Sequence, residues 1–485
     1  MTTGTKRASA GLFRILQEGR NCWRIVPARR VAFLIDGAAY FDALAAALCR
    51  AERRVIILSW DFDAGMRLDA EDPETELRRI LPELIARRPE LHVYILVWDV
   101  APYFGPSRLF AEWKSEGWLK HPRIHFRYDG RHPTGGTLHE KVVCVDDGLA
   151  FVGGIDLTVE RWDTSEHLPD DPRRIDPKGH PYPPVHDLQV AVEGPAAAAV
   201  TELALERWAL ATDESLTPPD PSHACWPEHL TPDLMDRPVA IARTRPGSDA
   251  EPRITEVMEL NRSALGGARR SIYLETQYFS NGEIADILAR HLEPPHGPEI
   301  VLVIWRETAG LIERYVMGSN RERLLRRLAK ADRHGRLRAY YLAVPDGSNQ
   351  EIGLHAKLVI VDDAFVRVGS SNLNHRSQGL DSECDVAIEA TDEATAQAIE
   401  GLRARLLAEH LGRPPDEVRA AVAAHGLIGA IERLHGPASR LRAFEIDHES
   451  GSTLPFPGTT VLDPDEPLNL DYLRRHLRDG RWRRP

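Results

Sequence analysis

Short apolar runs rich in β-branched residues recur along the chain and alternate with longer amphipathic segments. The first half contains RVIILSW, HVYILVW, KVVCVD and LQVAVE, and the second half contains SIYLET, EIVLVIW, KLVIVD and DVAIE. Runs of this length and composition are typical of buried strands. The amphipathic segments predict helices at 39–51, 196–210, 312–330 and 393–410. Strands alternating with helices predict an α/β fold with a largely buried sheet.

The pattern repeats itself at a fixed offset. RRVIIL at 53–58 matches RRSIYL at 269–274, an offset of 216. LHEKVVCVDDGLAFVGG at 138–154 matches LHAKLVIVDDAFVRVGS at 354–370 with the same offset of 216, and nine of the 17 positions are identical. Internal similarity of this kind predicts two structurally related halves.

Further along the chain the offset becomes shorter. DLQVAVE at 187–193 matches ECDVAIE at 383–389 with an offset of 196, so the first half carries 20 additional residues. The Pro- and Asp-rich stretch near 163–185 is where they fall, and its composition predicts a surface loop.

The repeat and the composition together define the domain organisation. We expect a first half at 1–216, a linker rich in Pro, Asp and Ser at 217–238, a second half at 239–411 and a C-terminal extension at 412–485 without a counterpart. The extension ends in the basic segment LRRHLRDGRWRRP, which we interpret as a solvated helix end in preference to a contact for anionic lipid.

Composition limits the classes of protein. The chain has 485 residues, 42% of them hydrophobic, which suits two globular domains. Its formal charge of -12 argues against a nonspecific nuclease, since such proteins usually present a basic face. The five cysteines are scattered without a CxxC pair, and the chain has no long apolar run. We therefore expect a cytoplasmic protein whose membrane contact, if any, is peripheral.

Each half carries one copy of the pattern His-x-Lys-x4-Asp. The copies are His139, Lys141 and Asp146, and His355, Lys357 and Asp362. Residues two apart on a strand share a face, so each imidazole lies beside an ammonium. The ammonium neutralises phosphoryl oxygens while the ring attacks or donates a proton. The two aspartates end their strands and are predicted to anchor local structure.

A glycine-containing turn follows each motif. We expect the backbone of Gly153 and Gly154 in the first copy, and Ser370 and Asn372 in the second, to bind the phosphate of a substrate. Asp156 stands where the second copy has Asn372, and its carboxylate would repel a phosphate. The two halves should therefore contribute unequally.

A nucleophilic imidazole needs an acceptor for its other nitrogen. Asp187 and Glu383 occupy equivalent places in the two halves. We assign Asp187 to orient His139 and Glu383 to orient His355.

Other sources of chemistry are absent from the sequence. It contains no GxSxG elbow, HExxH helix, Walker loop or compact carboxylate cluster for two metals. The aromatic residues in WDFD at 60–63 and TQYFS at 276–280 either line a substrate groove or pack at strand ends. A duplicated structural domain gives no reason to keep a His and a Lys in a Val-rich strand twice, because burying them without function is costly.

The motifs identify a family resemblance. The phrases at 138–163, 185–194, 272–280 and 354–383 resemble the phospholipase D superfamily, defined by paired HxKx4D motifs, and are most similar to its eukaryotic-type branch. The resemblance implies two similar α/β halves related by a pseudo-twofold axis, with mixed sheets flanked by helices. It departs from the family at Thr276, where an Asn is usual, and we expect no N-terminal lipid-targeting domain.

The resemblance also implies a reaction. Members form a covalent phosphohistidine and resolve it with water or an alcohol, with no cofactor and no metal in the chemistry. By analogy His139 is the nucleophile and His355 the general acid, although the reverse assignment is open. Two histidines in different protonation states predict a bell-shaped pH–rate profile.

The resulting functional expectation is hydrolysis or transphosphatidylation of glycerophospholipids at a membrane surface, releasing phosphatidic acid and the headgroup. We expect a monomer that binds no nucleic acid. A phosphatidyltransferase of the cardiolipin synthase kind and a nuclease of the same superfamily remain the alternatives.

Overall fold

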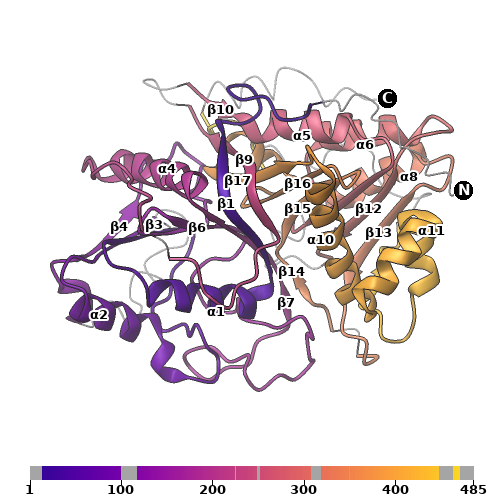
Figure 1. Ribbon diagram of the computed structural model, residues 1–485. Coiled ribbons are helices and arrows are strands. Elements are labelled where there is room, and N and C mark those ends of the chain that lie inside the picture. The colour runs from indigo at the N-terminus through magenta and orange to yellow at the C-terminus, as the bar shows by residue number, and fades with distance from the viewer. Residues whose placement is uncertain are drawn as a thin grey trace, which may run out of the picture.

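A computed structural model describes residues 14–99, 117–223, 225–247, 252–306, 318–348, 350–446 and 463–469. The described part is one mixed sheet with helices on both faces (Figure 1). The first half contributes β1 (Arg24–Ile35), β2 (Arg54–Ser59), β3 (His92–Trp98), β4 (Ile124–Asp129), β5 (Val142–Val145), β6 (Leu149–Gly153) and β8 (Leu188–Glu193). The second contributes β9 (Leu234–Arg245), β11 (Ser271–Thr276), β12 (Glu299–Ile304), β13 (Leu337–Leu342), β15 (Lys357–Val361), β16 (Phe365–Gly369) and β17 (Glu383–Glu389).

The order of the strands is symmetric about the pair formed by β1 and β9. It reads β13-β12-β11-β15-β16-β17-β9 and then β1-β8-β6-β5-β2-β3-β4, so each strand of one half has a counterpart at the same distance from the β1–β9 pair. Parallel and antiparallel pairings match as well, since β2–β3 and β11–β12 are parallel and β2–β5 and β11–β15 are antiparallel. This topology agrees with the expected pseudo-twofold α/β architecture.

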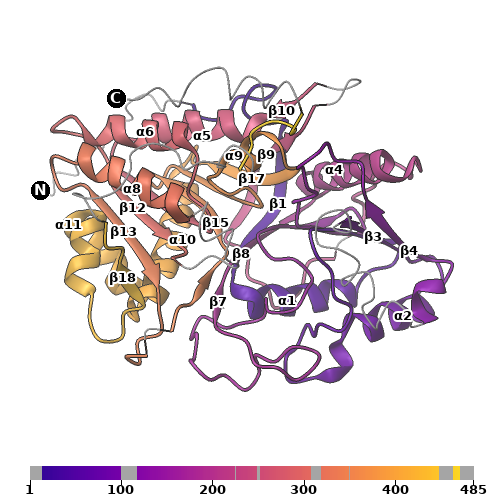
Figure 2. The ribbon, with the colours of Figure 1, turned by 180° about the vertical axis from the view of Figure 1, so that it is seen from behind.

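The helices follow the same symmetry. They are α1 (Asp36–Leu48), α2 (Leu77–Arg87), α4 (Pro195–Thr212), α5 (Glu256–Gly266), α6 (Gly282–Leu292), α8 (Ser319–Ala331), α9 (His375–Gly379), α10 (Glu393–Leu411) and α11 (Pro415–Leu434). In Figure 1, α1 lies below the strands of the first half and α5 and α6 lie above those of the second. α4 lies on the opposite side of the first half from α1, and α10 lies on the opposite side of the second half from α5 and α6. Figure 2 shows the same arrangement from behind.

Three clusters of apolar side chains hold these layers together. One fills the first half around Phe41 and Phe151, and a second fills the other half around Leu288 and Phe365. The third runs through both halves and includes Trp208 of α4 and Leu407 of α10. Because this third cluster is shared, apolar burial favours the docked state of the halves.

The sequence predicted eight of these fourteen strands and four of the nine described helices, and it missed β4, β6, β13, β16 and the two strands at the centre, β1 and β9. The eight predicted strands are present, and the predicted helices at 39–51, 196–210 and 393–410 correspond to α1, α4 and α10. The fourth corresponds to α8 from residue 319 onward, and residues 312–317 lie outside the described part. β1 and β9 each contain a proline, which is unusual in a central strand, and Pro27 and Pro238 stand opposite each other in the ladder.

Two details of the predicted repeat need correction. β9 begins at Leu234, so the last residues of the segment 217–238 belong to a central strand. The amide of Asp146 donates to the carbonyl of Arg54, and the amide of Asp362 donates to that of Ser271. The structural offset between β2 and β11 is therefore 217, one residue more than the sequence match indicated.

Asp146 and Asp362 anchor local structure, as predicted. Asp146 accepts hydrogen bonds from the amides of Glu52, Arg53 and Arg54 at 2.7–2.9 Å. Asp362 accepts from the amides at 269, 270 and 271 at 2.6–2.8 Å. Each carboxylate thus ties the turn after its motif strand to the start of the neighbouring strand.

The additional residues near 163–185 form an irregular segment, apart from the two-residue strand β7 (Val185–His186) at its end. In the C-terminal extension, α11 packs on α10 and β18 (Leu441–Ala443) pairs with β13. The basic segment 473–485 lies outside the described residues. Among the helices that the structure describes, none has both the length and the apolar character needed to cross a membrane.

Candidate active site

The two motif histidines lie where the halves meet, each beside a short parallel contact between the halves. β14 (Gly353–Leu354) pairs with β7, and the amide of His355 donates to the carbonyl of His186 at 2.8 Å. In the related place, Leu138 bridges Ser382, and the amide of His139 donates to the carbonyl of Ser382 at 3.0 Å. Each histidine is therefore aligned by the backbone of the opposite half.

These contacts correct the predicted assignment of carboxylates. Nδ1 of His139 lies 2.9 Å from Oε2 of Glu383, and Nδ1 of His355 lies 2.7 Å from Oδ2 of Asp187. Each carboxylate holds the histidine of the other half, whereas the sequence analysis paired Asp187 with His139 and Glu383 with His355. The reason is geometric. The residue before Asp187 pairs with Leu354, which precedes His355, and the residue before Glu383 pairs with Leu138, which precedes His139. Each carboxylate is therefore brought next to the histidine of the other half.

The carboxylate at Nδ1 leaves Nε2 of each ring as the reactive atom. Both imidazoles are largely enclosed, with side chains 16% and 15% exposed. Burial lowers the pKa of His139 well below its usual range, and the charge of Lys141 lowers it further. Burial and Lys357 lower the pKa of His355 to about 3. Without a bound anion, both rings are thus neutral at neutral pH.

The two carboxylates differ in their electrostatics. Burial alone would raise the pKa of Asp187, but the charge of His355 and the hydrogen bond with it lower that pKa. Burial raises the pKa of Glu383 well above its usual range, and Asp381 adds to the effect. An ionised carboxylate at Nδ1 stabilises an imidazolium, so His355 is better placed than His139 to carry a proton.

The lysines also differ, as the sequence analysis expected of the two halves. Nζ of Lys141 lies 3.2 Å from Oδ2 of Asp156, and the other oxygen of this carboxylate, Oδ1, accepts from the hydroxyl of Ser59 and the amide of Trp60. Each lysine donates to the carbonyl of the histidine of its own motif, but Nζ of Lys357 has Oε1 of Gln277 at 3.4 Å where Lys141 has a carboxylate. Burial lowers the pKa of Lys357 to about 7. Lys357 is therefore the cation that gains most from an anionic ligand.

Ser370 and Asn372 have different surroundings. The hydroxyl of Ser370 donates to Oε2 of Glu383 at 2.5 Å, the same oxygen that faces His139. Ser370 therefore positions a carboxylate. Asn372 is 2% exposed, and its Oδ1 lacks a hydrogen-bond partner in the described structure. Its position corresponds to that of Asp156, so its side-chain amide remains a candidate for binding phosphate.

The glycines do not offer free amides to a phosphate, contrary to the prediction. The amide of Gly154 donates to the carbonyl of Leu188 at 3.0 Å, and that of Gly153 points to the carbonyl of Lys141 at 3.4 Å. A Cβ atom at Gly154 would overlap the carboxylate of Asp187. The turn is rich in glycine because a neighbouring carboxylate and strand pass close to its backbone.

The aromatic residues at 60–63 and 276–280 were expected either to line a substrate groove or to pack at strand ends, and they differ in their burial. Phe62 and Phe279 are 5% and 1% exposed and pack in the cores of the two halves. Trp60 and Tyr278 are only partly buried. Thr276 donates to the carbonyl of Tyr278, as the equivalent Ser59 donates to the carbonyl of Asp61. Thr276 thus supports the local turn.

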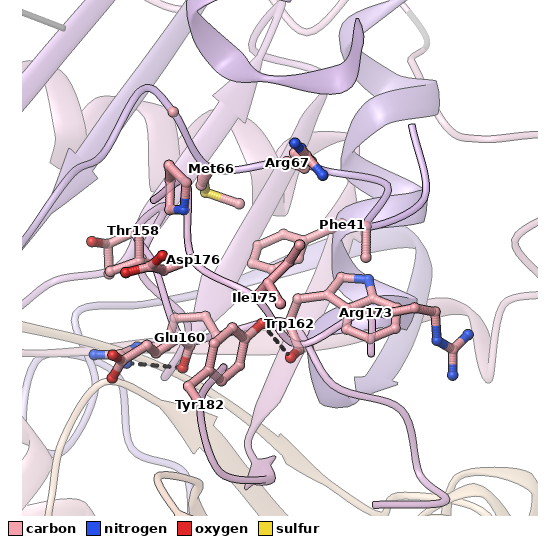
Figure 3. A pocket seen from close by; sticks show the side chains of 15 residues that line it. Phe41, Met66, Arg67, Thr158, Glu160, Trp162, Arg173, Ile175, Asp176 and Tyr182 are labelled. Carbon is pink, nitrogen blue, oxygen red and sulfur yellow. Dashed lines mark hydrogen bonds between the residues drawn. The ribbon is translucent and has the colours of Figure 1, made fainter. Parts of the chain in front are cut away.

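A hollow of about 430 Å³ lies between α1 and the 158–182 segment (Figure 3). Phe41, Trp162 and Tyr182 form its aromatic side, and the hydroxyl of Tyr182 donates to the carbonyl of Trp162 at 2.9 Å. Arg161 also lines it, and the charge of Arg161 lowers the pKa values of His355 and Lys357. The hollow therefore adjoins the site without including the motif side chains.

The sequence analysis missed the second layer of the site. Gln277, Ser59 and Arg161 act on the motif lysines or on Asp156, but none of them belongs to the repeated motif. The opposite-half pairing follows from the bridges at residues 186 and 382, which directly precede the two carboxylates and which the sequence does not reveal.

Comparison with known proteins places the site in context. Residues 262–405 match the family model described as "Cardiolipin synthase, PLD-like domain". The chain is 28% identical over 240 residues to phospholipase D zeta 1 from Arabidopsis thaliana, a match that covers 42% of this chain and 22% of that protein. It is 23% identical over 511 residues to phospholipase D alpha 1 from Carica papaya, covering 76% and 63% respectively. The chain thus spans less than two thirds of the length of these relatives.

The fold also matches a solved structure. Phosphatidylserine synthase from Haemophilus influenzae Rd KW20 superposes with a TM-score of 0.56 at 15% sequence identity, and the match covers 84% of this chain and 96% of that one. At this identity the likeness concerns the fold, which agrees with the topology described above.

Proposed function

Since this chain belongs to the phospholipase D superfamily, we propose that it is a phospholipase D-type phosphodiesterase that hydrolyses or transphosphatidylates glycerophospholipids through a phosphohistidine. The observation that carries the proposal is the reciprocal pairing of two histidines with two carboxylates across the halves. It leaves two reactive Nε2 atoms in one site, next to two lysines that favour an anion.

In the first step, Nε2 of His139 attacks phosphorus and the bond to the headgroup oxygen breaks. That oxygen takes the proton from Nε2 of His355, so the headgroup leaves as an alcohol. The phosphatidyl group is then bound to His139. In the second step, His355 removes a proton from water or an acceptor alcohol, whose oxygen attacks phosphorus and breaks the phosphorus–nitrogen bond.

The electrostatics of the site support this division of roles. His355 needs a proton for the first step, although the pKa of the free ring is about 3. An entering phosphate brings negative charge next to Lys357 and offsets the effect that lowers that pKa. Asp187, which lies 2.7 Å from Nδ1 of His355, then stabilises the imidazolium.

Substrate and partners follow from the same proposal. The lipid is presented at a membrane surface, and water or an alcohol is the acceptor. The chain acts as a single copy, because both motifs lie on one polypeptide. Reaction occurs in the cytoplasm with peripheral membrane contact.

A phosphatidyltransferase is the second candidate, and the phosphatidylserine synthase neighbour and the name of the matching family model favour it. Both candidates share the phosphatidyl-enzyme and differ in the acceptor. Incubation with phosphatidylcholine and ethanol should yield phosphatidylethanol, whereas a dedicated transferase would act on phosphatidylglycerol and release little phosphatidic acid. Cleavage of DNA without activity on lipid vesicles would point instead to a nuclease.

The two-histidine scheme is tested by replacing each ring. His139→Ala and His355→Ala should each lose nearly all turnover of phosphatidylcholine, while His180→Ala, at a largely exposed histidine, should keep it. Near-normal turnover by either motif variant would exclude the scheme. Acid-quenched trapping of a phosphoryl group on His139 would identify the nucleophile.

A further inference from the structure

A second cluster of titratable side chains lies behind the candidate active site, buried where the halves meet. Its inner members are Asp36 at the start of α1, His167 in the additional segment of the first half, His186 in β7 and Glu409 near the end of α10. His167 and His186 are fully buried, and Asp36 is 1% exposed. None of the four takes part in the proposed reaction.

The four side chains converge on one point. Nε2 of His167 lies 3.1 Å from Oε1 of Glu409 and 3.7 Å from Oδ2 of Asp36. Nδ1 of His186 lies 2.8 Å from Oδ1 of Asp36 and 2.9 Å from Oε1 of Glu409. One ligand atom from each residue lies within 4.8 Å of the others. Tetrahedral zinc with bonds of about 2.0–2.1 Å separates its ligand atoms by roughly 3.3–3.4 Å, and the observed distances bracket this value.

The outer contacts have the arrangement that metal-bound histidines use. Nδ1 of His167 lies 2.9 Å from Oδ2 of Asp163, and Nε2 of His186 lies 3.0 Å from Oε2 of Glu275. One nitrogen of each ring is thus held by a carboxylate, which fixes the tautomer and directs the other nitrogen into the cluster. Asp163 is itself fixed by Arg174 at 3.0 Å, and Glu275 by Tyr273 at 2.5 Å.

One inner atom lacks a hydrogen-bond partner. Oδ2 of Asp36 is buried and makes no hydrogen bond in the described structure, although it faces the centre of the cluster. Nδ1 of His186 faces the same centre, where it lies next to the carboxylates of Asp36 and Glu409. A buried polar atom without a partner is costly, and a bound cation would satisfy this oxygen of Asp36.

We propose that Asp36, His167, His186 and Glu409 bind one Zn²⁺ ion as a closed structural site that fastens the two halves together. Zinc suits two imidazoles with two carboxylates in a small tetrahedral cage, whereas Ca²⁺ and Mg²⁺ prefer six or more oxygen ligands. Three ligands come from the first half and Glu409 from the second, so binding requires docked halves. This site is distinct from the reaction centre and does not rest on the proposed function.

The site would also brace the chemistry. His186 directly precedes Asp187, the carboxylate that holds His355, and the amide of Asp36 donates to the carbonyl of Asp187 at 2.9 Å. Fixing His186 and Asp36 therefore fixes the backbone on both sides of that carboxylate. The additional segment of the first half gains a role, since it supplies both His167 and Asp163.

The test measures metal in the full-length protein produced in zinc-supplemented medium. Mass spectrometry of the desalted protein should find about one Zn²⁺ per chain, and a strong chelator should lower its melting temperature until Zn²⁺ is restored. Replacement with Co²⁺ should give the visible absorption of a tetrahedral site. Less than about 0.2 Zn²⁺ per chain, together with a melting temperature unaffected by chelator or added Zn²⁺, would overturn the proposal in favour of a metal-free network of ion pairs.

Variants locate the ion. His167→Asn and Glu409→Gln should lower the zinc content at least fivefold, whereas Cys225→Ser should retain it, although Cys225 lies in another group of potential ligands with Asp146 and His223. His375→Asn, at a partly exposed histidine that pairs with Asp463 at 3.1 Å, controls for the loss of a histidine–carboxylate pair elsewhere. Loss of zinc from Cys225→Ser but not from His167→Asn would show that the ion binds elsewhere.

Discussion

Asp187→Asn is expected to disable the step that depends on His355 and to spare the step that depends on His139. The carboxylate lies 2.7 Å from Nδ1 of His355 and more than one strand away from the first motif. An amide of the same shape cannot stabilise an imidazolium and can favour the wrong tautomer. The loss of a charged partner at a buried ring amounts to about 3–5 kcal/mol, which corresponds to roughly 10²–10⁴-fold in rate.

A substrate that needs no acid separates the two steps. From a phosphatidyl ester of p-nitrophenol, the headgroup leaves as a stable anion, so formation of the phosphatidyl-enzyme does not require His355. In stopped-flow measurements, Asp187→Asn should release about one p-nitrophenol per active site at nearly the wild-type rate and then turn over slowly. With phosphatidylcholine, the same variant should be slow from the start.

Glu383→Gln provides the reciprocal perturbation, because Glu383 holds His139 at 2.9 Å. It should slow the burst itself with both substrates. Asp176→Asn is the matched control, since Asp176 pairs with the exposed His180 at 3.1 Å in the additional segment, and its kinetics should be those of the wild type.

The two histidine variants provide the reference kinetics for each step. Asp187→Asn should resemble His355→Ala, and Glu383→Gln should resemble His139→Ala. If Asp187→Asn instead resembles His139→Ala, the pairing across the halves is wrong. If Asp187→Asn does resemble His355→Ala but both variants lose the burst, the contact between Asp187 and His355 stands and the roles of the two histidines are exchanged.

Three further predictions follow from individual side chains. Lys357→Met should reduce turnover at least about 100-fold. It should also raise the melting temperature, and by more at pH 6 than at pH 9, because burial penalises the charged form of this lysine, whose pKa is about 7. An equal rise in melting temperature at both pH values would contradict burial as the cause of the lowered pKa. Asp146→Ala and Asp362→Ala should each lower the free energy of unfolding in urea by about 3 kcal/mol, since each leaves three backbone amides without their acceptor; changes below about 1 kcal/mol would count against the anchoring role. Gly154→Ala should reproduce the kinetic defect of Asp187→Asn, because the new Cβ atom would displace that carboxylate, while leaving inhibition by inorganic phosphate unchanged; weaker phosphate inhibition would restore a role for the glycine turn in binding.

The features that could be predicted from the sequence are those that depend on local pattern. The motif strands, the anchoring role of Asp146 and Asp362, and the unequal halves all follow from short-range periodicity and from the Asp156–Asn372 difference. β1 and β9 were not predicted, and each contains a proline, which is unusual in a central strand. Here the two prolines face each other, so the amides that both strands lack fall at a single place in the ladder.

The carboxylate assignment failed for a different reason. The sequence distance from His139 to Asp187 is compatible with a neighbouring strand, and nothing local distinguishes it from the 244-residue separation between His139 and Glu383. The choice is made by the docking of the halves, which the repeat predicts only as a symmetry. The buried cluster around His186 was missed for the same reason, because its members come from four separate segments.

The reciprocal pairing has a consequence for the time at which the protein becomes active. During synthesis, the first motif leaves the ribosome long before Glu383, which must reach Nδ1 of His139. The second histidine emerges with Asp187 already made, but the two meet only when β7 and β14 pair. A chain that has not yet reached Glu383 therefore cannot form the pair that orients His139, and under the proposed mechanism the nucleophile is assembled only after the second half has been made and docked.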